Sequence, residues 1–340
     1  MKKYFVLLLV VISSQAFAQF KLSGAIKHYT GHADLKINIP PVYGFDEANS
    51  IKIPVAKDGS FYINLPIKIQ KFADITFQQH FHLILLTPGK NLKVELDQTT
   101  NGFRSITGTA NPENIVLQKA NVEEYPFFLQ NDNAYISLSP ADLNNKLVRP
   151  YFAMRDKRIA AVNQSTIGPK NKKLIIGEIK SAAYNNLYEL VLLGGDYHEK
   201  IINMVISAFD RADPKPEAMP AGPQYYLFAN NYLWYKQTKS SIKVKSQNIK
   251  PNQPMPDYGI TVAEFNAFNS KYGLLYIRWL TATRFLPNPV IEQWGYSLIG
   301  HAIKSSNTAL VDELVKNYKR KFPNGQYLTK INKQTAGLKH

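Results

Sequence analysis

The sequence contains no cysteine among its 340 residues. This absence excludes disulfide bonds, catalysis by a thiolate and metal sites with thiolate ligands. Stability must therefore come from the burial of apolar side chains. Since 45% of the residues are hydrophobic, a chain of this length has enough apolar surface to form two hydrophobic cores.

Apolar runs long enough to span a membrane are also absent. The one sustained run, residues 5–12, follows two lysines and precedes an A-x-A cleavage site that ends at Ala18. These are the parts of a secretory signal, whereas a membrane-spanning helix needs about 20 apolar residues. We therefore predict a signal peptide over residues 1–18 and a periplasmic or secreted protein that begins at Gln19. Because no cysteine follows the cleavage site, we do not expect a lipoprotein.

Acidic residues are scarce, with 25 Asp and Glu against 41 Lys and Arg, which gives a formal net charge of +16 at pH 7. The segment 236–256 has five lysines and no acidic residue, and its prolines and polar residues predict an exposed loop. A basic surface can bind nucleic acid, anionic lipid or acidic glycan, and the predicted export argues against nucleic acid. Solvated lysines that keep the protein soluble are the alternative explanation.

The motifs of common catalytic sites are missing as well. The patterns G-x-S-x-G, Walker A and G-x-G-x-x-G do not occur. His198-Glu199 begins like the zinc-binding H-E-x-x-H motif, but Ile202 occupies the position of the second histidine. His80 and His82 share one face of a predicted strand and could bind a metal, but no third ligand is indicated; partly buried or interfacial histidines are the alternative. We predict no catalytic, cofactor or metal site, and we do not expect an enzyme.

Two predicted β-hairpins form the clearest pattern in the sequence. In the first, a three-residue loop ends at Gly59, where the turn needs a left-handed residue, and pairs Val55 with Phe61. The same register pairs Ile51 with Leu65 and places the apolar side chains of both strands on one face.

In the second hairpin, an even loop around Pro88-Gly89 pairs Leu85 with Leu92. The first of its strands is also apolar on the opposite face near its end, so this face needs a cover. We expect helices from the rest of the chain to provide it; left open, the face is a candidate interaction surface. Its residues are His80, His82, Ile84 and Leu86.

Alternation with a period of two, interrupted by turn residues, recurs along the first third of the chain. About seven such strands predict an antiparallel β-sandwich over residues 19–110. At Asn111-Pro112 the period changes to about 3.6, with the asparagine as N-cap, which predicts a helical domain over residues 111–335 and a short tail over 336–340. The predicted fold class is α+β, an N-terminal antiparallel β-sandwich followed by an all-helical domain.

The clearest predicted helix spans residues 172–193. Thr261 and Glu264 have the spacing of a capping box and predict a long helix that ends at about Phe285. Further helices are expected over 197–209, 225–235 and 309–321, and from Ser139-Pro140. The aromatic residues of these helices either fill a core or line a groove. Besides His80 and His82, the candidate interaction residues are Trp234, Tyr235, Lys239, Lys243 and Lys245.

The order of these parts, with the motifs KDGSFYINLP, LLTPGKNLKVELD and KRKFPNGQYLTKIN, resembles the N-terminal region of TlpA/ResA-like thiol–disulfide oxidoreductases. In that family a DUF4369-like β-domain and helices precede a periplasmic thioredoxin domain. The family's chemistry uses a C-x-x-C pair, which this sequence lacks, so no redox residue is carried over. The resemblance implies a stand-alone accessory domain, or the front part of a protein whose catalytic part is encoded separately or lost.

Three hypotheses for the function follow. The first is a non-catalytic exported protein that binds a ligand or partner. The second is an accessory subunit of a thiol–disulfide redox system that acts with a separate thioredoxin-like partner; a neighbouring reading frame with C-x-x-C would favour it. The third is a module that binds envelope glycan or another anionic ligand. The expected partner is a periplasmic thioredoxin-like protein or an envelope component, with no cofactor and no nucleic acid.

Overall fold

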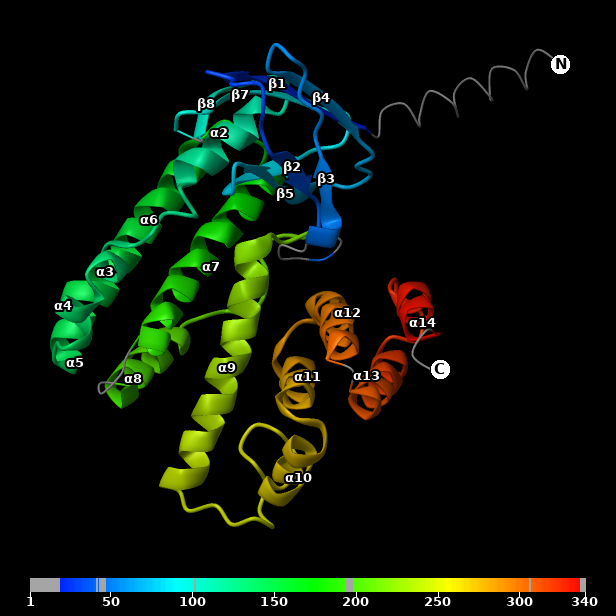
Figure 1. The fold of residues 1–340 in the computed structure, drawn as a ribbon. Helices are drawn as coiled ribbons and strands as arrows, with labels where there is room; N and C mark the ends of the chain where they lie inside the picture. Colours follow the sequence, from blue (N-terminus) through cyan, green and yellow to red (C-terminus); the bar gives the residue numbers. More distant parts are fainter. Residues whose placement is uncertain are drawn as a thin grey trace. The chain divides into compact units, whose positions relative to one another are not determined.

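The computed structural model describes residues 19–40, 42, 47–100, 102–193, 198–305 and 307–336 (Figure 1). The predicted signal peptide, the two glycines after Leu193 and residues 337–340 lie outside the described residues. Contacts divide the chain into two compact units. Unit 1 comprises the residues up to 135, 144–183 and 216–225, and unit 2 comprises 136–143, 184–215 and the residues from 226 onward. Residue 110 therefore marks the change from strands to helices, while both compact units contain helices.

In the described part of unit 1 the strands form two four-stranded sheets, with the orders β4-β1-β7-β8 and β3-β2-β5-β6. One hydrophobic core combines side chains from both sheets, among them Phe20, Leu22, Leu35 and Ile75. The fold is therefore α+β with an N-terminal sandwich, as predicted. The strands are β1 (Phe20–Lys27), β2 (Leu35–Asn38), β3 (Ser50–Lys52), β4 (Ser60–Leu65), β5 (Lys71–Phe77), β6 (His80–Leu86), β7 (Asn91–Asp97) and β8 (Gly102–Thr107).

The pair β1–β7 is parallel, so the predicted antiparallel sandwich is wrong at this pair. Here the two backbones come close together, because Gly24 lies opposite Val94. A Cβ at residue 24 would lie 1.9 Å from the carbonyl oxygen of Val94 and 2.5 Å from the ring of Phe61. Only glycine fits this position, which lies in the middle of the sheet.

The first predicted hairpin forms only its turn. Val55 pairs with Phe61 across a loop whose last residue is a glycine with φ of +80°, as predicted. Beyond this bridge β3 pairs with β2, and β4 pairs with β1, so the predicted pairing of Ile51 with Leu65 is wrong. Pro54 has no N–H to donate, and the chain passes beside it from one sheet to the other.

The second predicted hairpin does not form. β6 pairs with β5, whereas β7 pairs with β1 and β8, so the chain crosses between the sheets at the Pro-Gly turn. The prediction failed because β6 is apolar on both faces. Ile84 and Leu86 belong to the sandwich core, and Leu83 and Leu85 pack against helical residues. Helices do cover the second face of this strand, but it is the face opposite to the one predicted to need a cover.

Helix α2 (Asn111–Ala120) closes the free edge of β6, which would otherwise present unpaired backbone groups. Asn114 Oδ1 accepts a hydrogen bond from the N–H of Leu85 at 2.8 Å, and Asn114 Nδ2 donates to the carbonyl oxygen of Leu85 at 3.1 Å. For the backbone N–H and C=O groups of Leu85, the side-chain amide of Asn114 thus takes the place of a neighbouring strand. Figure 1 shows α2 beside β8 and α6, in agreement with their contacts. The N-cap is Ala110, one residue before the predicted asparagine.

The remaining helices confirm some predictions and correct others. The helix predicted over 172–193 is α7, and the capping box between Thr261 and Glu264 is present with both hydrogen bonds. The single long helix after Thr261 is wrong, because Gly273 separates α10 from α11. The loop predicted over 236–256 is wrong as far as residue 246, because α9 continues to Ser246. The helix start predicted at Ser139-Pro140 is confirmed, with Ser139 as the N-cap of α5, whereas α3, α4, α12 and α14 were not predicted.

The helical elements after α2, in chain order, have the following bounds. They are α3 (Phe127–Gln130), α4 (Asp132–Ile136), α5 (Pro140–Asp142), the π-helix η2 (Leu143–Val148), α6 (Arg149–Gln164), α7 (Pro169–Leu193), α8 (His198–Phe209), α9 (Pro223–Ser246), α10 (Val262–Tyr272), α11 (Leu274–Phe285), α12 (Asn288–Lys304), α13 (Thr308–Lys321) and α14 (Leu328–Ala336). A short 3-10 helix, η1 (Glu47–Asn49), precedes β3.

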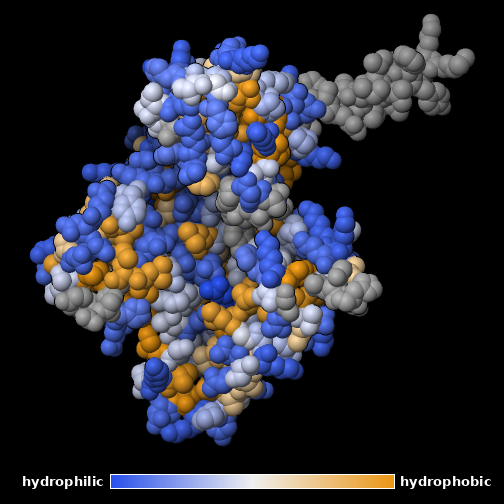
Figure 2. Space-filling model, in the orientation of Figure 1, coloured by the Kyte–Doolittle hydropathy of each residue, from blue (hydrophilic) through white to orange (hydrophobic). Residues whose placement is uncertain are grey.

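Apolar side chains reach the surface at separate places. Figure 2 shows hydrophobic residues between larger hydrophilic areas on one face of the molecule. Ile69, Tyr125, Leu192 and Leu274 are among the exposed large residues. Exposed apolar residues of this kind are ordinary on soluble proteins, and they indicate no docking site by themselves. No helix in the described ranges is long and apolar enough to cross a membrane.

Candidate functional site: a basic cleft in unit 2

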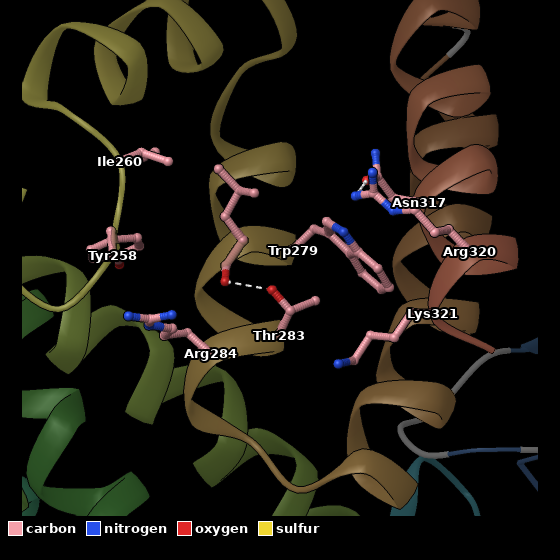
Figure 3. Close-up of a pocket in the computed structure, with 9 residues that line it drawn as sticks. Tyr258, Ile260, Trp279, Thr283, Arg284, Asn317, Arg320 and Lys321 are labelled. Atoms are coloured by element: carbon pink, nitrogen blue, oxygen red, sulfur yellow. Dashed lines mark hydrogen bonds between the residues drawn. The ribbon is translucent and has the colours of Figure 1, made fainter.

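A cleft of about 470 Å³ lies over helix α11 in unit 2 (Figure 3). In Figure 3 the segment with Tyr258 and Ile260 lies on one side of α11, and helix α13 lies on the other. The volume falls in the range of small-molecule sites. The lining residues are Tyr258, Ile260, Trp279, Leu280, Thr283, Arg284, Asn317, Arg320 and Lys321.

Two glycines set the position of α11. Gly273, with φ of +75°, separates it from α10 in a conformation that favours glycine. Gly295 of α12 makes room for Trp279, because a Cβ at residue 295 would lie 2.6 Å from the indole ring. Trp279 is only 3% exposed, so it forms an apolar floor of the cleft and offers little open ring surface.

The side of the cleft before α10 is held by a small core of Met255, Tyr258 and Val262. The hydroxyl groups of Tyr258 and Thr281 are hydrogen-bonded at 2.8 Å, and Thr281 donates to the carbonyl oxygen of Ile277 at 2.7 Å. Burial raises the pKa of Tyr258 to about 12. This phenol therefore stays protonated at neutral pH and serves to fix the wall.

Three cations line the cleft, Arg284, Arg320 and Lys321, and none of its lining residues in the described part of the chain carries a carboxyl group. Arg284 Nε donates to the carbonyl oxygen of Asp257 at 2.9 Å, and Arg320 donates to Asn317 Oδ1 at 2.7 Å. Within the described ranges none of the three forms an ion pair with a carboxylate. Their positive charges remain available to a ligand.

Two acidic side chains that lie close in sequence to the lining residues already have partners. The carboxylate of Asp257 pairs with Lys243 at 3.2 Å. Glu313, one turn before Asn317 on α13, accepts a hydrogen bond from Asn317 Nδ2 at 2.7 Å. Glu313 also lies 3.9 Å from Lys316, and among the described residues neither carboxylate forms an ion pair with a cation of the cleft.

All three cations lie in the last turns of helices, Arg284 in α11, and Arg320 and Lys321 in α13. Cations at this position stabilise a helix because its C-terminus carries a partial negative charge. Each C-terminus corresponds to roughly −0.5 of a charge, so two of them offset about one of the three positive charges. Lys319 shares the last turn of α13, so the two C-termini leave most of the positive charge of the cleft unbalanced.

The histidines of the predicted interaction surface lie in unit 1. His80 is exposed, and its Nδ1 lies 3.2 Å from the carbonyl oxygen of Gln78. The ring of His82 stacks on Phe103 with 4.5 Å between centroids. Across the described residues, no cluster of three or more histidine or acidic side chains could hold a metal ion.

The other predicted residues lie on α9 in unit 2. Tyr235 is 3% exposed and donates to Asp210 Oδ1 at 2.5 Å, so its inclusion in a surface is wrong. Lys239 also pairs with Asp210, and Lys243 pairs with Asp257. Trp234 is half-buried against Tyr188. Lys245 is exposed. Most of these side chains are thus engaged within unit 2, and none of them lines the cleft.

Three carboxyl groups in unit 1 have raised pKa values, and burial is the main cause for each. The pKa is about 6 for Asp74, about 7 for Glu123 and about 8 for Glu178. Glu178, at 1% exposure, accepts hydrogen bonds from the N–H groups of Gly222, Gln224 and Tyr225. It thereby satisfies free N–H groups at the start of α9 from the side of α7. We assign this carboxyl group a structural role.

Sequence reasoning missed the cleft, although two of its signals are present. The run KRKFPNG contains Arg320 and Lys321, and it entered the prediction only as part of a motif shared with a family and as the end of a helix. Trp279 was placed among aromatics that either fill a core or line a groove, and it does both. The approach of Arg284 to residues 320 and 321 depends on the packing of α11 against α13, which no local pattern reveals.

No family model matches the sequence, and no curated protein matches it as a relative. The resemblance to the N-terminal region of TlpA/ResA-like proteins therefore stays a prediction from turn and strand patterns. The functional proposal is therefore based on the geometry of the cleft.

Proposed function

We propose that this chain is a non-catalytic, exported binding protein whose ligand is an anion held in the basic cleft of unit 2. The observation that supports the proposal is the set of three cations, on both sides of one cleft, without a carboxylate partner. Arginine suits this role because its planar guanidinium can bind a carboxylate or a phosphate with two parallel hydrogen bonds.

The cations are exposed, which limits the strength of each contact. An exposed ion pair contributes about 0.2–1 kcal/mol, so three of them give roughly 0.6–3 kcal/mol. A dissociation constant of about 1 mM already needs about 4 kcal/mol. The remaining free energy must come from Asn317, Thr283 and the apolar floor, and the ligand must reach these groups as well.

Retention on an immobilised acidic polysaccharide tests the proposal against simple charge attraction. The variant with Arg320→Gln and Lys321→Gln loses two charges from the cleft. The matched variant with Lys316→Gln and Lys319→Gln loses two exposed charges from the same helix but outside the cleft. We expect the cleft variant to elute at clearly lower salt than the matched variant. Equal shifts for the two variants would show that the net charge, and not the cleft, causes retention.

A further inference from the structure

We infer that the cleft takes a ligand with two or more anionic groups, bound at the same time by Arg284 on one side and by Arg320 and Lys321 on the other. The inference rests on the proposed function and specifies its ligand class. That class is an oligomer of phosphate or of an acidic sugar, since both present repeated groups that an arginine binds.

The first reason is the placement of the charges. Figure 3 shows Arg284 directed toward the side of Tyr258, while Lys321 extends from α13 toward α11. The other lining residues, Leu280 and Thr283 among them, are uncharged. A ligand with a single anionic group can neutralise one side only, and the other side then keeps its unpaired charge.

The second reason is the amount of charge. The helix C-termini offset about one of the three positive charges, so roughly two remain for the ligand. Like charges that converge on one cleft repel each other, and an anion that bridges them relieves this repulsion. The match is therefore to a ligand that carries at least two negative charges at separate positions.

The third reason is that the cleft exposes little aromatic surface. Trp279 is 3% exposed and Tyr258 is 8% exposed, so neither offers a full ring face for stacking against a sugar. Recognition must come from the charged groups and from Asn317 and Thr283. The cleft is thus expected to distinguish ligands by the number of their anionic groups more than by the ring that carries them.

Bridging makes the second contact intramolecular, which raises the affinity without any new kind of contact. For a trimer, three equivalent groups give a statistical advantage of about threefold over the monomer when only one side binds. A second contact worth about 1 kcal/mol, the upper value for one exposed ion pair, adds another factor of about five. We therefore expect a trimer to bind at least tenfold more tightly than its monomer.

Calorimetric titration of the full purified protein tests the inference with two pairs of probes. Tripolyphosphate is compared with orthophosphate, and trigalacturonate with galacturonate, at constant ionic strength. Trimer binding that is at least tenfold tighter than monomer binding, in either pair, supports the inference. The pair that shows this difference identifies the source of the anion. A ratio of about threefold in both pairs would overturn the inference, while the proposed function would stand.

Variants separate bridging from general attraction. Arg284→Gln, and on the opposite side Arg320→Gln combined with Lys321→Gln, should each lower the ratio of trimer to monomer affinity to about threefold, and the variant with all three substitutions should lower it no further. Lys319→Gln, which removes an exposed charge outside the cleft, should retain the full ratio. If the ratio survives in Arg284→Gln, the inference is wrong. If binding of all probes is the same in parent and cleft variants, the proposed function is wrong too; unchanged circular dichroism would exclude misfolding as the cause.

Discussion

The buried carboxyl group of Glu178 should make the stability of unit 1 depend on pH, and replacing it with glutamine should reduce this dependence. Its Oε1 accepts from the N–H groups of Gly222 and Tyr225 at 3.1 and 3.3 Å, and its Oε2 accepts from Gln224 N at 2.9 Å. A Cβ at residue 222 would lie 2.5 Å from Oε2, so the segment 222–225 packs directly on the carboxyl group. Glutamine keeps the size of the side chain but cannot titrate.

Burial raises the pKa of Glu178 from 4.5 to about 8. The folded state therefore binds the proton more tightly than the unfolded state does. The resulting stabilisation is fully present below pH 4.5, and it is lost as the pH rises through 8. One pKa unit corresponds to about 1.4 kcal/mol, so this group lowers the free energy of unfolding by on the order of 4 kcal/mol between about pH 5 and pH 8.

Glu178→Gln should be less stable than the parent at about pH 5, by roughly 1–3 kcal/mol, because the amide nitrogen then faces a backbone N–H group and one hydrogen bond is lost. The difference between the two proteins should shrink as the pH rises and reverse by about pH 8, since only the parent loses on the order of 4 kcal/mol through this group. Glu189→Gln, on the same helix but only half-buried, is the control and should follow the parent.

Urea denaturation over this pH range, followed by far-ultraviolet circular dichroism, measures the effect. All three tryptophans lie in unit 2, so their fluorescence reports the other unit separately. Parallel stability curves for parent and Glu178→Gln would refute the reasoning. They would mean that the three N–H groups hold the carboxylate ionised throughout the range in spite of its burial.

Two further predictions concern the sandwich. Gly24→Ala should destabilise unit 1 by about 3 kcal/mol or more, because the new Cβ meets the carbonyl oxygen of Val94 at 1.9 Å; Gly168→Ala, which meets nothing within 4 Å, should be harmless in the same denaturation experiment. Asn114→Ala should lower the free energy of unfolding of unit 1 by about 2–4 kcal/mol, because the N–H and C=O groups of Leu85 lose their partner at a buried sheet edge. Hydrogen exchange at the Leu85 amide should accelerate, and an unchanged rate would contradict the assigned role.

Local patterns in the sequence predicted the elements of the sandwich, but not the pairing of its strands. The turn before Phe61 follows from residue chemistry alone, since a left-handed residue is needed and a glycine is present. The partner of β4 is β1, about forty residues earlier in the chain, and alternation along β4 is satisfied equally well by either neighbour. Register patterns thus indicate which face of a strand is buried, and they leave the choice of neighbouring strand open.

The prediction of a loop over the lysine-rich segment 236–256 was wrong for a different reason. Its lysines and the following prolines are typical of a loop, yet residues 236–246 continue the helix α9. Buried neighbours on that helix, Tyr232, Leu233 and Tyr235, anchor it in unit 2, while Lys239 and Lys243 pair with Asp210 and Asp257. Packing of one apolar face outweighs the loop-forming tendency of the opposite face.

The excess of basic residues bears directly on how the cleft must be tested. A chain with a formal charge of +16 attracts any polyanion at low salt, and such attraction says nothing about the cleft. At about 0.15 M salt the screening length is about 8 Å, so charges outside the contact contribute little, whereas groups in direct contact with the ligand keep most of their effect. Binding that persists under these conditions and is lost in Arg284→Gln, but not in Lys319→Gln, can only come from the cleft. Measurements at low salt alone would credit the cleft with an attraction that the whole surface exerts.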